Sequence, residues 1–331
     1  MEKLNIGVIG TGHLGKLHTK LLAEINNANL AGIYDANPDQ AKSVANELNV
    51  KFFENPDKLL ENVNAVSIAA ITSAHYELAK YCFEKNVHVF IEKPITATIP
   101  QAEELVKIAK EKNLKLQVGH IERFNPALVS MEELINDPMF IQTDRLAQFN
   151  PRGTDVAVVL DLMIHDIDII LSLVKSEVKD IKANGVPVVS DNVDIANARI
   201  EFENGAVANV TASRISQKKM RKMRIFQRDC YIALDFITGI SDVYRLLPME
   251  KEFDQSYISF GEIGVGEKKK RLVYSQPEHR EINALKYELQ LFVDAVISGN
   301  ELVVSGEDGL RALKVAERIL NQIELNLKGR I

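Results

Sequence analysis

A glycine-rich turn near the start of the chain constrains the fold more than any other feature. Leu4–Ile9 (LNIGVI) is typical of a short buried strand, and it leads directly into the turn Gly10-Thr11-Gly12-His13-Leu14-Gly15. Residues 16–24 follow, with leucines at helical spacing. In such a unit the first glycine permits a tight turn, the second lets the backbone approach a pyrophosphate, and the third lets helix and strand pack closely. The pattern predicts a Rossmann-type dinucleotide-binding unit whose helix N-terminus faces the phosphates.

The residue after the second predicted strand sets the expected cofactor. Leu30–Tyr34 is apolar and leads into Asp35, about 20 residues beyond Gly15. A carboxylate at this place accepts hydrogen bonds from both ribose hydroxyls, whereas the 2′-phosphate of NADP would meet a like charge. We therefore expect NAD as the cofactor, with NADP less suitable.

Length and composition exclude several classes of protein. The chain has 331 residues, which suggests two domains at about 150 residues each. Its net charge of −6 argues against broad binding to nucleic acid or to an anionic membrane. No membrane span is expected, because no apolar segment is long enough, and no signal peptide is expected, because the first predicted strand begins at Leu4. Its two cysteines, Cys82 and Cys230, are far apart and in no metal-binding spacing, so a cytoplasmic protein is expected.

Strand and helix patterns alternate up to residue 122. The expected strands are 63–71, 87–91 and 114–118, and the expected helices are 39–48, 74–85 and 99–112. The helices 39–48 and 99–112 have a proline near their start, Pro38 and Pro100 respectively. This alternation predicts a parallel sheet in an NAD-binding domain over residues 1–122, with ligands beyond the carboxyl ends of the strands.

The pattern changes after residue 122. Strands are expected at 140–149, 194–202, 206–212, 223–226 and 230–236, with helices at 155–174, 281–297 and 307–326. Glu203-Asn204-Gly205 is typical of a hairpin turn, and Gly299-Asn300 of a helix end. Residues 123–331 are thus expected to form an α+β domain on a mostly antiparallel, open-faced sheet, which gives an α/β protein overall.

The tripeptide Glu92-Lys93-Pro94 directly follows a predicted strand and so lies at the ligand-binding edge of the sheet. The Lys93 ammonium can donate to a substrate hydroxyl and a ribose hydroxyl together, although a surface lysine on a loop is an equally good interpretation. Glu92 and Lys93 are expected to contact the cofactor, as are Thr72 and His75. His75, like His18, lies on a helix near these loops, and a structural role is the first interpretation of both residues.

One predicted helix carries a polar stripe on an otherwise apolar surface. Asp161, His165, Asp168 and Ser172 share one face, whereas Asp166 lies off it. The stripe lacks the long charged side chains that are usual on a wet helix surface, which favours a position facing a cleft over a solvent face. A divalent metal is a less favoured use of these carboxylates, since Lys or His can supply both a base and a polarising group.

Two further segments have open interpretations. Gly119–Pro126 follows a strand, so Arg123 and Asn125 could bind a polar substrate there; alternatively the segment is a connector in which Arg123 forms a structural salt bridge. Lys218–Arg224 places five positive charges in seven residues. It is either an anion site, suited to a substrate with phosphates, or a solvated edge strand.

The glycine turn through His18, the EKP tripeptide and the D-x-x-x-H-x-x-D of Asp161 to Asp168 together resemble the family of glucose–fructose oxidoreductase, inositol 2-dehydrogenase and rhizopine-catabolism oxidoreductase (Gfo/Idh/MocA). The resemblance covers nearly the whole chain. It implies active-site roles for Lys93, Asp161 and His165, and a homodimer or homotetramer formed through the C-terminal sheet.

One departure from the family pattern narrows the expected function. Residues 152–155 read RGTD, where many members carry a glycine run. Together with the basic stretch, this resembles a branch that includes UDP-N-acetylglucosamine 3-dehydrogenases. The expected activity is therefore NAD-dependent oxidation of a ring hydroxyl of a sugar or nucleotide sugar. The alternatives are a dehydrogenase of a free sugar or cyclitol, and a non-catalytic protein that senses NAD.

Overall fold

The computed structural model describes residues 3–150, 156–252, 256–278 and 280–329. The chain forms two compact units, which are described separately. Unit 1 comprises residues 1–124 and 283–314, and unit 2 comprises residues 125–282 and 315–331. The predicted boundary after residue 122 lies close to the end of the first segment of unit 1. Residues 283–314, which the prediction placed in the second domain, instead cluster with unit 1.

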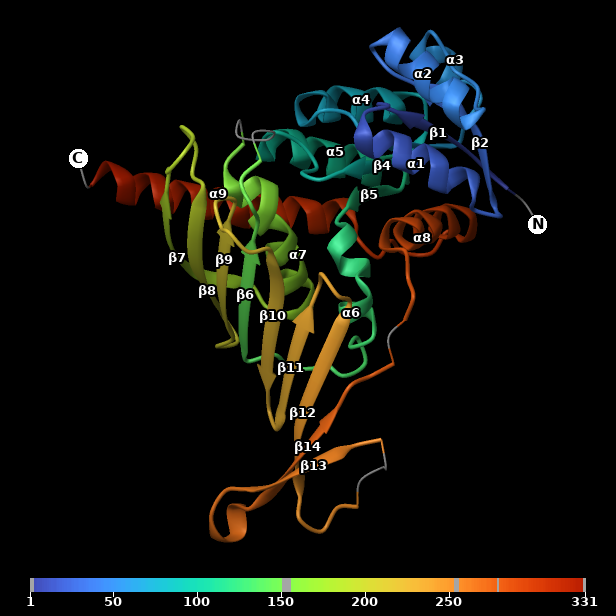
Figure 1. The fold of residues 1–331 in the computed structure, drawn as a ribbon. Coiled ribbons are helices and arrows are strands. Elements are labelled where there is room, and N and C mark those ends of the chain that lie inside the picture. Colours follow the sequence, from blue (N-terminus) through green and yellow to red (C-terminus); the bar gives the residue numbers. More distant parts are fainter. Residues whose placement is uncertain (1–2, 151–155, 253–255, 279, 330–331) are drawn as a thin grey trace. The chain divides into compact units, whose positions relative to one another are not determined.

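Unit 1 is built on a five-stranded parallel sheet (Figure 1). The strands lie in the order β2-β1-β3-β4-β5 and span Ala28–Tyr34, Leu4–Ile9, Ala65–Ile68, His88–Glu92 and Leu116–Gly119. The helices are α1 (His13–Ala23), α2 (Pro38–Leu48), α3 (Pro56–Leu60), α4 (Thr72–Glu84), α5 (Ile99–Glu111) and α8 (Ala284–Ser298), with a 3₁₀ turn η1 (Ile121–Phe124) after β5. The strand order reverses its direction of growth between β1 and β3, which is where such sheets bind ligands.

Local sequence signals account for the ends of these helices. The Asn37 side chain accepts hydrogen bonds from the N–H groups of Asp39 and Gln40, so it caps α2 just ahead of Pro38. Gly299 ends α8 in the left-handed conformation, with a φ of 77°. The apolar face of α8 joins the core beneath β1 and α1 through Leu289, Phe292 and Val293, which are fully buried. This packing explains why a helix distant in sequence belongs to unit 1.

Unit 2 is built on a nine-stranded sheet in the order β13-β14-β12-β11-β10-β6-β9-β8-β7. In that order the strands span Ile258–Ile263, Lys270–Ser275, Ile240–Pro248, Cys230–Asp235, Met220–Gln227, Phe140–Leu146, Val207–Ser213, Ile195–Phe202 and Val178–Val186. β6 and β9 pair in parallel, and the other neighbouring pairs are antiparallel. The two sheets confirm the predicted α/β class with a mostly antiparallel second sheet.

Five helical segments complete the chain. These are α6 (Pro126–Val129), the π turn η2 (Val159–Met163), α7 (Ile164–Leu173), the 3₁₀ turn η3 (Gly266–Lys268) and α9 (Gly306–Lys328). The first turns of α9 belong to unit 1 and the rest to unit 2. Two predicted strands are longer than the observed ones. The strand predicted at 63–71 is observed as β3 (Ala65–Ile68), and the strand predicted at 140–149 is observed as β6 (Phe140–Leu146).

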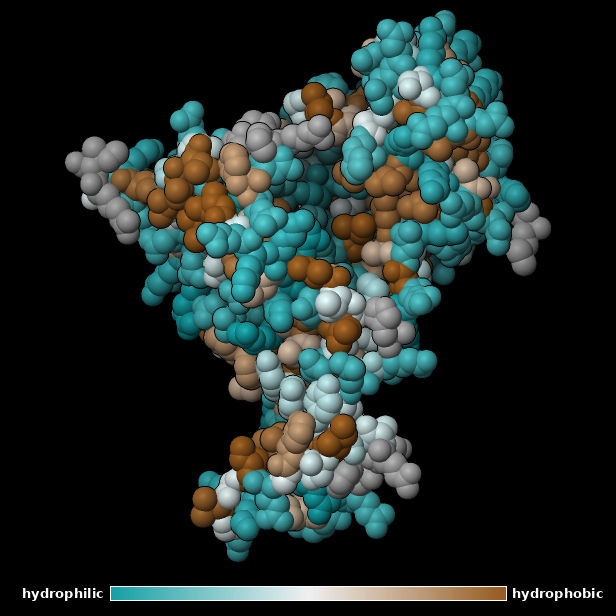
Figure 2. All heavy atoms as spheres, viewed as in Figure 1, coloured by the Kyte–Doolittle hydropathy of each residue, from teal (hydrophilic) through white to brown (hydrophobic). Residues whose placement is uncertain are grey.

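The two faces of the unit 2 sheet differ in burial. Ile225, Ile232 and Val243 on one face are buried, because helices pack on that side. The opposite face carries a row of aromatic rings across neighbouring strands, in which Phe226 and Tyr231 stack at 4.7 Å and Tyr231 and Tyr244 at 5.4 Å. Figure 2 shows apolar atoms gathered on the hairpin of β13 and β14, where Ile258, Phe260, Ile263 and Val265 are exposed.

Candidate active site

The three glycines of the turn occupy three different environments. Gly10 has a φ of 89°, and its N–H donates to the Tyr34 carbonyl oxygen at 2.9 Å. A Cβ added at Gly15 would lie 1.8 Å from the Gly10 carbonyl oxygen, so only glycine allows α1 to start this close to the turn. A Cβ added at Gly12 would meet none of the described atoms within 4 Å. Gly12 therefore borders open space, as a residue that leaves room for a ligand should.

The start of α1 fits an anionic ligand. Gly12 is the N-cap, and among the described residues no side chain caps this end of the helix. First-turn N–H groups without a capping side chain, together with the positive end of the helix dipole, form a phosphate site. Thr11, His13 and Leu14 complete the turn that was predicted to hold the cofactor; Thr11 is buried, and the other two are exposed.

Asp35 lies beside this turn, at the end of β2. The Thr11 N–H and hydroxyl donate to Asp35 Oδ2 at 2.6 and 3.0 Å, and the Asn37 N–H donates to Oδ1 at 2.8 Å. The Gln40 side chain donates to the Thr11 carbonyl oxygen at 3.0 Å, which ties α2 to the same turn. The carboxylate is thus held at the carboxyl edge of the sheet, where a ribose of a dinucleotide would meet it.

The loop after β4 carries Lys93, which is half-buried. Glu92 is buried just before it, and its Oε1 lies 3.0 Å from His18 Nε2. A Cβ added at Gly119 would come within 3.1 Å of the Glu92 carboxylate, so this glycine leaves room for the acid. Glu92, which was predicted to contact the cofactor, therefore faces α1 and β5 within unit 1.

Thr72 begins α4, and His75 lies one turn later in the same helix. The His75 ring is buried, with Nδ1 2.9 Å from the Pro94 carbonyl oxygen and Nε2 3.1 Å from the Ala70 carbonyl oxygen. Burial lowers the pKa of His75, and the contacts with the two carbonyl groups oppose that shift only in part. A neutral imidazole has one N–H, so the ring donates to one of these carbonyl oxygens and lies close to the other, between two loops at the ligand edge.

In unit 2 the predicted helix 155–174 is a π turn followed by an α-helix. Asp161 lies in η2 and His165 in the first turn of α7; both are half-buried. The predicted polar stripe is not uniform, since Asp168 is buried and the Ser172 hydroxyl donates to the Ile169 carbonyl oxygen at 2.7 Å. A π turn changes the helical spacing locally and is frequent at functional sites. Lys93 belongs to the other unit, so its expected meeting with His165 over the nicotinamide stays a prediction.

Asp166, which lay off the predicted stripe, forms a buried ion pair that the sequence analysis missed. The Arg145 guanidinium on β6 donates from Nε to Asp166 Oδ2 at 2.9 Å and from Nη2 to Oδ1 at 2.8 Å. Both side chains are 3% exposed. The only signal in the sequence was a lone acid on the apolar side of the helix. This two-bond pair fixes α7 to the sheet immediately after His165.

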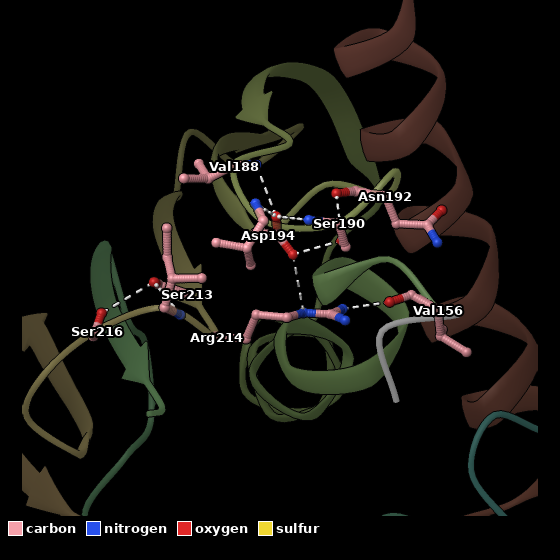
Figure 3. A network of polar contacts seen from close by, with 10 residues as sticks. Val156, Val188, Ser190, Asn192, Asp194, Ser213, Arg214 and Ser216 are labelled. Atoms are coloured by element: carbon pink, nitrogen blue, oxygen red, sulfur yellow. Dashed lines mark hydrogen bonds and ion pairs between the residues drawn. The ribbon is translucent and has the colours of Figure 1, made fainter. Parts of the chain in front are cut away.

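A second polar network lies in the turn between β7 and β8 (Figure 3). The buried Asp194 carboxylate accepts hydrogen bonds from the N–H groups of Val188, Val189 and Ser190, at 2.7, 2.7 and 3.0 Å. Burial raises the pKa of Asp194, but these bonds outweigh it and bring the pKa to about 2.

Arg214 connects this network to the start of the segment that carries Asp161 and His165. Its Nε lies 3.9 Å from Asp194 Oδ1, and its Nη2 donates to the Val156 carbonyl oxygen (Figure 3). Val156 is the first described residue after 151–155, so the predicted departure at 152–155 lies outside the described residues. Arg214 thus fixes the backbone that leads into η2.

Arg123 and Asn125, predicted to bind substrate, make contacts within their own units. Arg123 Nη2 lies 3.7 Å from Asp308 Oδ1, and Nη1 donates to the Val303 carbonyl oxygen at 3.4 Å. Asn125 accepts from the Ala127 N–H at 3.1 Å and so caps α6. These contacts favour the alternative interpretation, in which the segment is a structural connector.

The basic stretch is not an edge strand, and that part of the prediction is wrong. Most of it lies in β10, which pairs with β6 on one side and β11 on the other. Strand alternation divides its charges: Lys222 and Arg224 share a face with Phe226, whereas Arg221 is on the other face. Lys222 also lies 3.4 Å from Asp235, so the stretch does not form one continuous cationic surface.

The part of the chain that the structure describes lacks both a cluster of metal ligands and a membrane-spanning helix. No three His, Cys, Asp or Glu side chains gather there in a way that could hold a metal ion. None of the described helices is both long and apolar enough to cross a membrane.

Comparisons with known proteins agree with this geometry. A family model described as an oxidoreductase family with an NAD-binding Rossmann fold matches residues 4–120, and a model of the GFO/IDH/MocA C-terminal domain matches residues 139–231. A UDP-N-acetylglucosamine 3-dehydrogenase from Acidithiobacillus ferrooxidans is 41% identical over 246 residues, which are 74% of this chain and 78% of the relative. A solved structure of that name from the same organism has a TM-score of 0.87 at 34% identity, covering 98% of this chain and 99% of its own. A myo-inositol 2-dehydrogenase from Thermotoga maritima is 26% identical over 329 residues, covering 94% and 93% of the two chains.

Proposed function

Because the chain belongs to the Gfo/Idh/MocA oxidoreductase family, we propose that it oxidises a ring hydroxyl of a nucleotide sugar to a ketone, with NAD as the oxidant. The family, the NAD cofactor and the dehydrogenase class agree with the sequence prediction and are confirmed by the family models and relatives. The nucleotide sugar is the proposed part. The observation that carries it is the 41% identity to a relative named UDP-N-acetylglucosamine 3-dehydrogenase.

The residues of unit 1 fit NAD. The open space at Gly12 and the start of α1 suit the pyrophosphate, and the Asp35 carboxylate suits a ribose. When bound, NAD accepts a hydride at nicotinamide C4, chemistry that belongs to the cofactor. Lys93 follows β4 at the same edge of the sheet, so its ammonium is placed to donate to an oxygen near the reacting carbon.

We assign the proton transfer to His165, with Asp161 orienting its ring. The substrate carbon loses its hydrogen with two electrons, and the hydroxyl proton passes to His165. The Lys93 ammonium hydrogen-bonds the oxygen as it becomes a carbonyl. Lys93 is the alternative base, since an amine can take the same proton. Thr72 and Glu92 stay proposed cofactor neighbours, whereas the contacts of Arg123 and Asn125 argue for structural roles.

A free cyclitol is the second candidate substrate. It is favoured by relatives named as inositol dehydrogenases, such as the scyllo-inositol 2-dehydrogenase of Bacillus subtilis at 30% identity over 234 residues. Those identities are lower than that of the nucleotide-sugar relative, so the nucleotide sugar is preferred. A protein that binds NAD as a sensor without turnover is the remaining alternative.

The test is mass spectrometry of the purified protein with NAD and a pool of UDP-sugars, beside a pool of inositols. We expect a UDP-sugar to lose two mass units, and Lys93→Ala or His165→Ala to lower kcat by about 10²- to 10⁴-fold while NADH still binds. Oxidation of inositols alone would replace the substrate assignment. Near-normal turnover in both variants would remove the catalytic roles, and NADH binding without any product would indicate a sensor.

We also propose a cytoplasmic homodimer or homotetramer that assembles through the aromatic face of the unit 2 sheet. The row of Phe226, Tyr231 and Tyr244 supplies apolar area outside the core, and both cysteines are free thiols, which suits a reducing compartment. Light scattering of the wild type and of Tyr244→Glu tests the assembly. We expect the variant to dissociate, and a monomeric wild type would contradict the proposal.

A further inference from the structure

Two buried imidazole rings flank the loop that carries Lys93. His18 on α1 is 0% exposed and His75 on α4 is 1% exposed. Each ring contacts one side of the loop: His18 the residue before Lys93, and His75 the residue after it. Neither ring has a part in the proton transfer proposed above.

His18 connects the start of the loop to the sheet and to the cofactor helix. Its Nε2 lies 3.0 Å from Glu92 Oε1, at ion-pair distance but not aligned for a hydrogen bond. Its Nδ1 lies 2.7 Å from the Ser67 hydroxyl on β3. The ring also packs edge-on against Phe90, with 5.5 Å between centroids. Because α1 begins at the glycine turn, one side chain joins the predicted phosphate site to the lysine loop.

His75 connects the other end of the loop. Its Nδ1 lies 2.9 Å from the Pro94 carbonyl oxygen, and its Nε2 lies 3.1 Å from the Ala70 carbonyl oxygen after β3. The two histidines thus use different ring nitrogens toward the lysine loop: Nε2 in His18 and Nδ1 in His75.

We propose that His18 and His75 are positioning residues that hold the backbone on both sides of Lys93; their importance for turnover rests on the proposed function. A lysine side chain is long and loses much rotamer entropy when it is fixed, so its backbone must be held firmly for the ammonium to be placed well. A displacement of about 1 Å in a reacting group can cost about 100-fold in rate. The two contacts remove that freedom from the loop.

The different nitrogens allow a crossed test. Glutamine places its amide nitrogen near the position of imidazole Nε2, and asparagine places its own near Nδ1. His18→Gln therefore keeps the contact with Glu92, and His18→Asn loses it. The reverse holds at the other site, where His75→Asn keeps the contact with Pro94 and His75→Gln loses it. Damage that depends only on side-chain size would rank the two asparagine variants together.

The first measurement is amide hydrogen exchange of the full chain without substrate. Mass spectrometry then reads the exchange of the peptide that contains residues 92–97. We expect faster exchange in His18→Asn than in His18→Gln, and in His75→Gln than in His75→Asn. The second measurement is turnover, where the same order is expected in kcat, with about 10- to 100-fold between the members of each pair. NADH affinity should differ within a pair by less than about threefold.

The two measurements separate the two proposals. If exchange follows the crossed order but no variant and no wild type turns over, the positioning role of the two histidines is supported and the proposed function is wrong. Turnover with equal exchange in both members of each pair would overturn the positioning role. Faster exchange and lower kcat in both asparagine variants would also overturn it, because side-chain size alone would then explain the damage. If His18→Asn does not fold, the isosteric Glu92→Gln weakens the same contact and should also speed exchange of the loop.

Discussion

Replacing two glycines of the turn separates the space kept for a ligand from the space used in packing. A Cβ at Gly15 would lie 1.8 Å from the Gly10 carbonyl oxygen, whereas ordinary contact begins at 3.4 Å. The oxygen belongs to the backbone and the Cβ is bonded directly to Cα, so neither can move aside as the end of a flexible side chain would. We expect Gly15→Ala to cost about 3 kcal/mol, the upper end of the range for overpacking. For a unit of this size, that lowers Tm by about 6–12 °C.

Gly12→Ala should have the opposite profile. A Cβ there meets none of the described atoms within 4 Å, and the φ of −62° suits alanine, so stability should stay the same or rise by about 0.4–1 kcal/mol. A bound pyrophosphate would instead meet the new methyl group. The loss of one charge-assisted hydrogen bond, about 1.5–3 kcal/mol, weakens NADH binding by about 10- to 150-fold.

The assay pairs thermal unfolding with NADH titration by fluorescence for each variant. Gly12→Ala with wild-type NADH affinity would refute the assignment of the open space to the pyrophosphate. Gly15→Ala with an unchanged Tm would refute the packing argument. Gly205→Ala is a matched control, because its hairpin is in unit 2 and its φ of 87° predicts a stability loss without a change in NADH affinity.

Three further predictions test other parts of the structure. Asp35→Ala should lower the affinity for NADH and reduce the preference for NADH over NADPH, because it removes a hydrogen-bond acceptor for the ribose and a negative charge that repels the 2′-phosphate. An unchanged ratio of the two affinities in paired titrations would contradict this. Asp166→Asn removes the carboxylate charge that faces the buried Arg145 guanidinium and should lower the free energy of unfolding in urea by about 3–5 kcal/mol, whereas Arg145→Met with Asp166→Leu should recover most of that loss. Burial lowers the pKa of His75 in the folded state, so its contribution to stability is full above about pH 6.5 and is lost as the pH falls through the lower folded pKa. Below about pH 6.5 the free energy of unfolding of His75→Gln should therefore depend less on pH than that of the wild type. Equal pH dependence of the two proteins would contradict this.

The parallel half of the fold was predictable because its signals are local. Each strand of unit 1 is a short apolar run, and turn and capping residues such as Asn37 and Gly299 mark the helix ends. Strand ends were less predictable, since apolar residues continue past the last ladder hydrogen bond in segments such as 63–71. The place of α8 depends on a core shared with β1, which no local pattern reveals.

The antiparallel half was predicted less fully. β7 (Val178–Val186) and β12 (Ile240–Pro248) were not predicted, because one face of the sheet is open and polar residues are tolerated there. β13 is exposed along its whole length, so it has no apolar alternation to detect. β10 lies inside the sheet because it pairs with β6 on one side and β11 on the other, and strand order of this kind is not visible in local patterns.

The candidate site divides in the same way. The glycine turn, Asp35 and the position of Lys93 after a strand could be predicted, because each follows from one strand–turn–helix unit. The pairs Arg145–Asp166 and Arg214–Asp194 could not, since each joins elements whose register is set only by the folded sheet. His18 and His75 were visible as residues, but their shared contact with the lysine loop required the fold.

The two arginine pairs of unit 2 explain how a helix with an irregular start can still present His165 in a fixed position. Arg214 holds the Val156 carbonyl oxygen before the π turn, and Arg145 holds Asp166 directly after His165. The π turn η2 lies between these anchors, so its change of spacing is confined to the turn that carries Asp161. The contacts that define both anchors are made between residues of unit 2. If the proposed chemistry is right, losing an anchor must therefore act on kcat through the position of His165 and leave NADH affinity, a property of unit 1, unchanged.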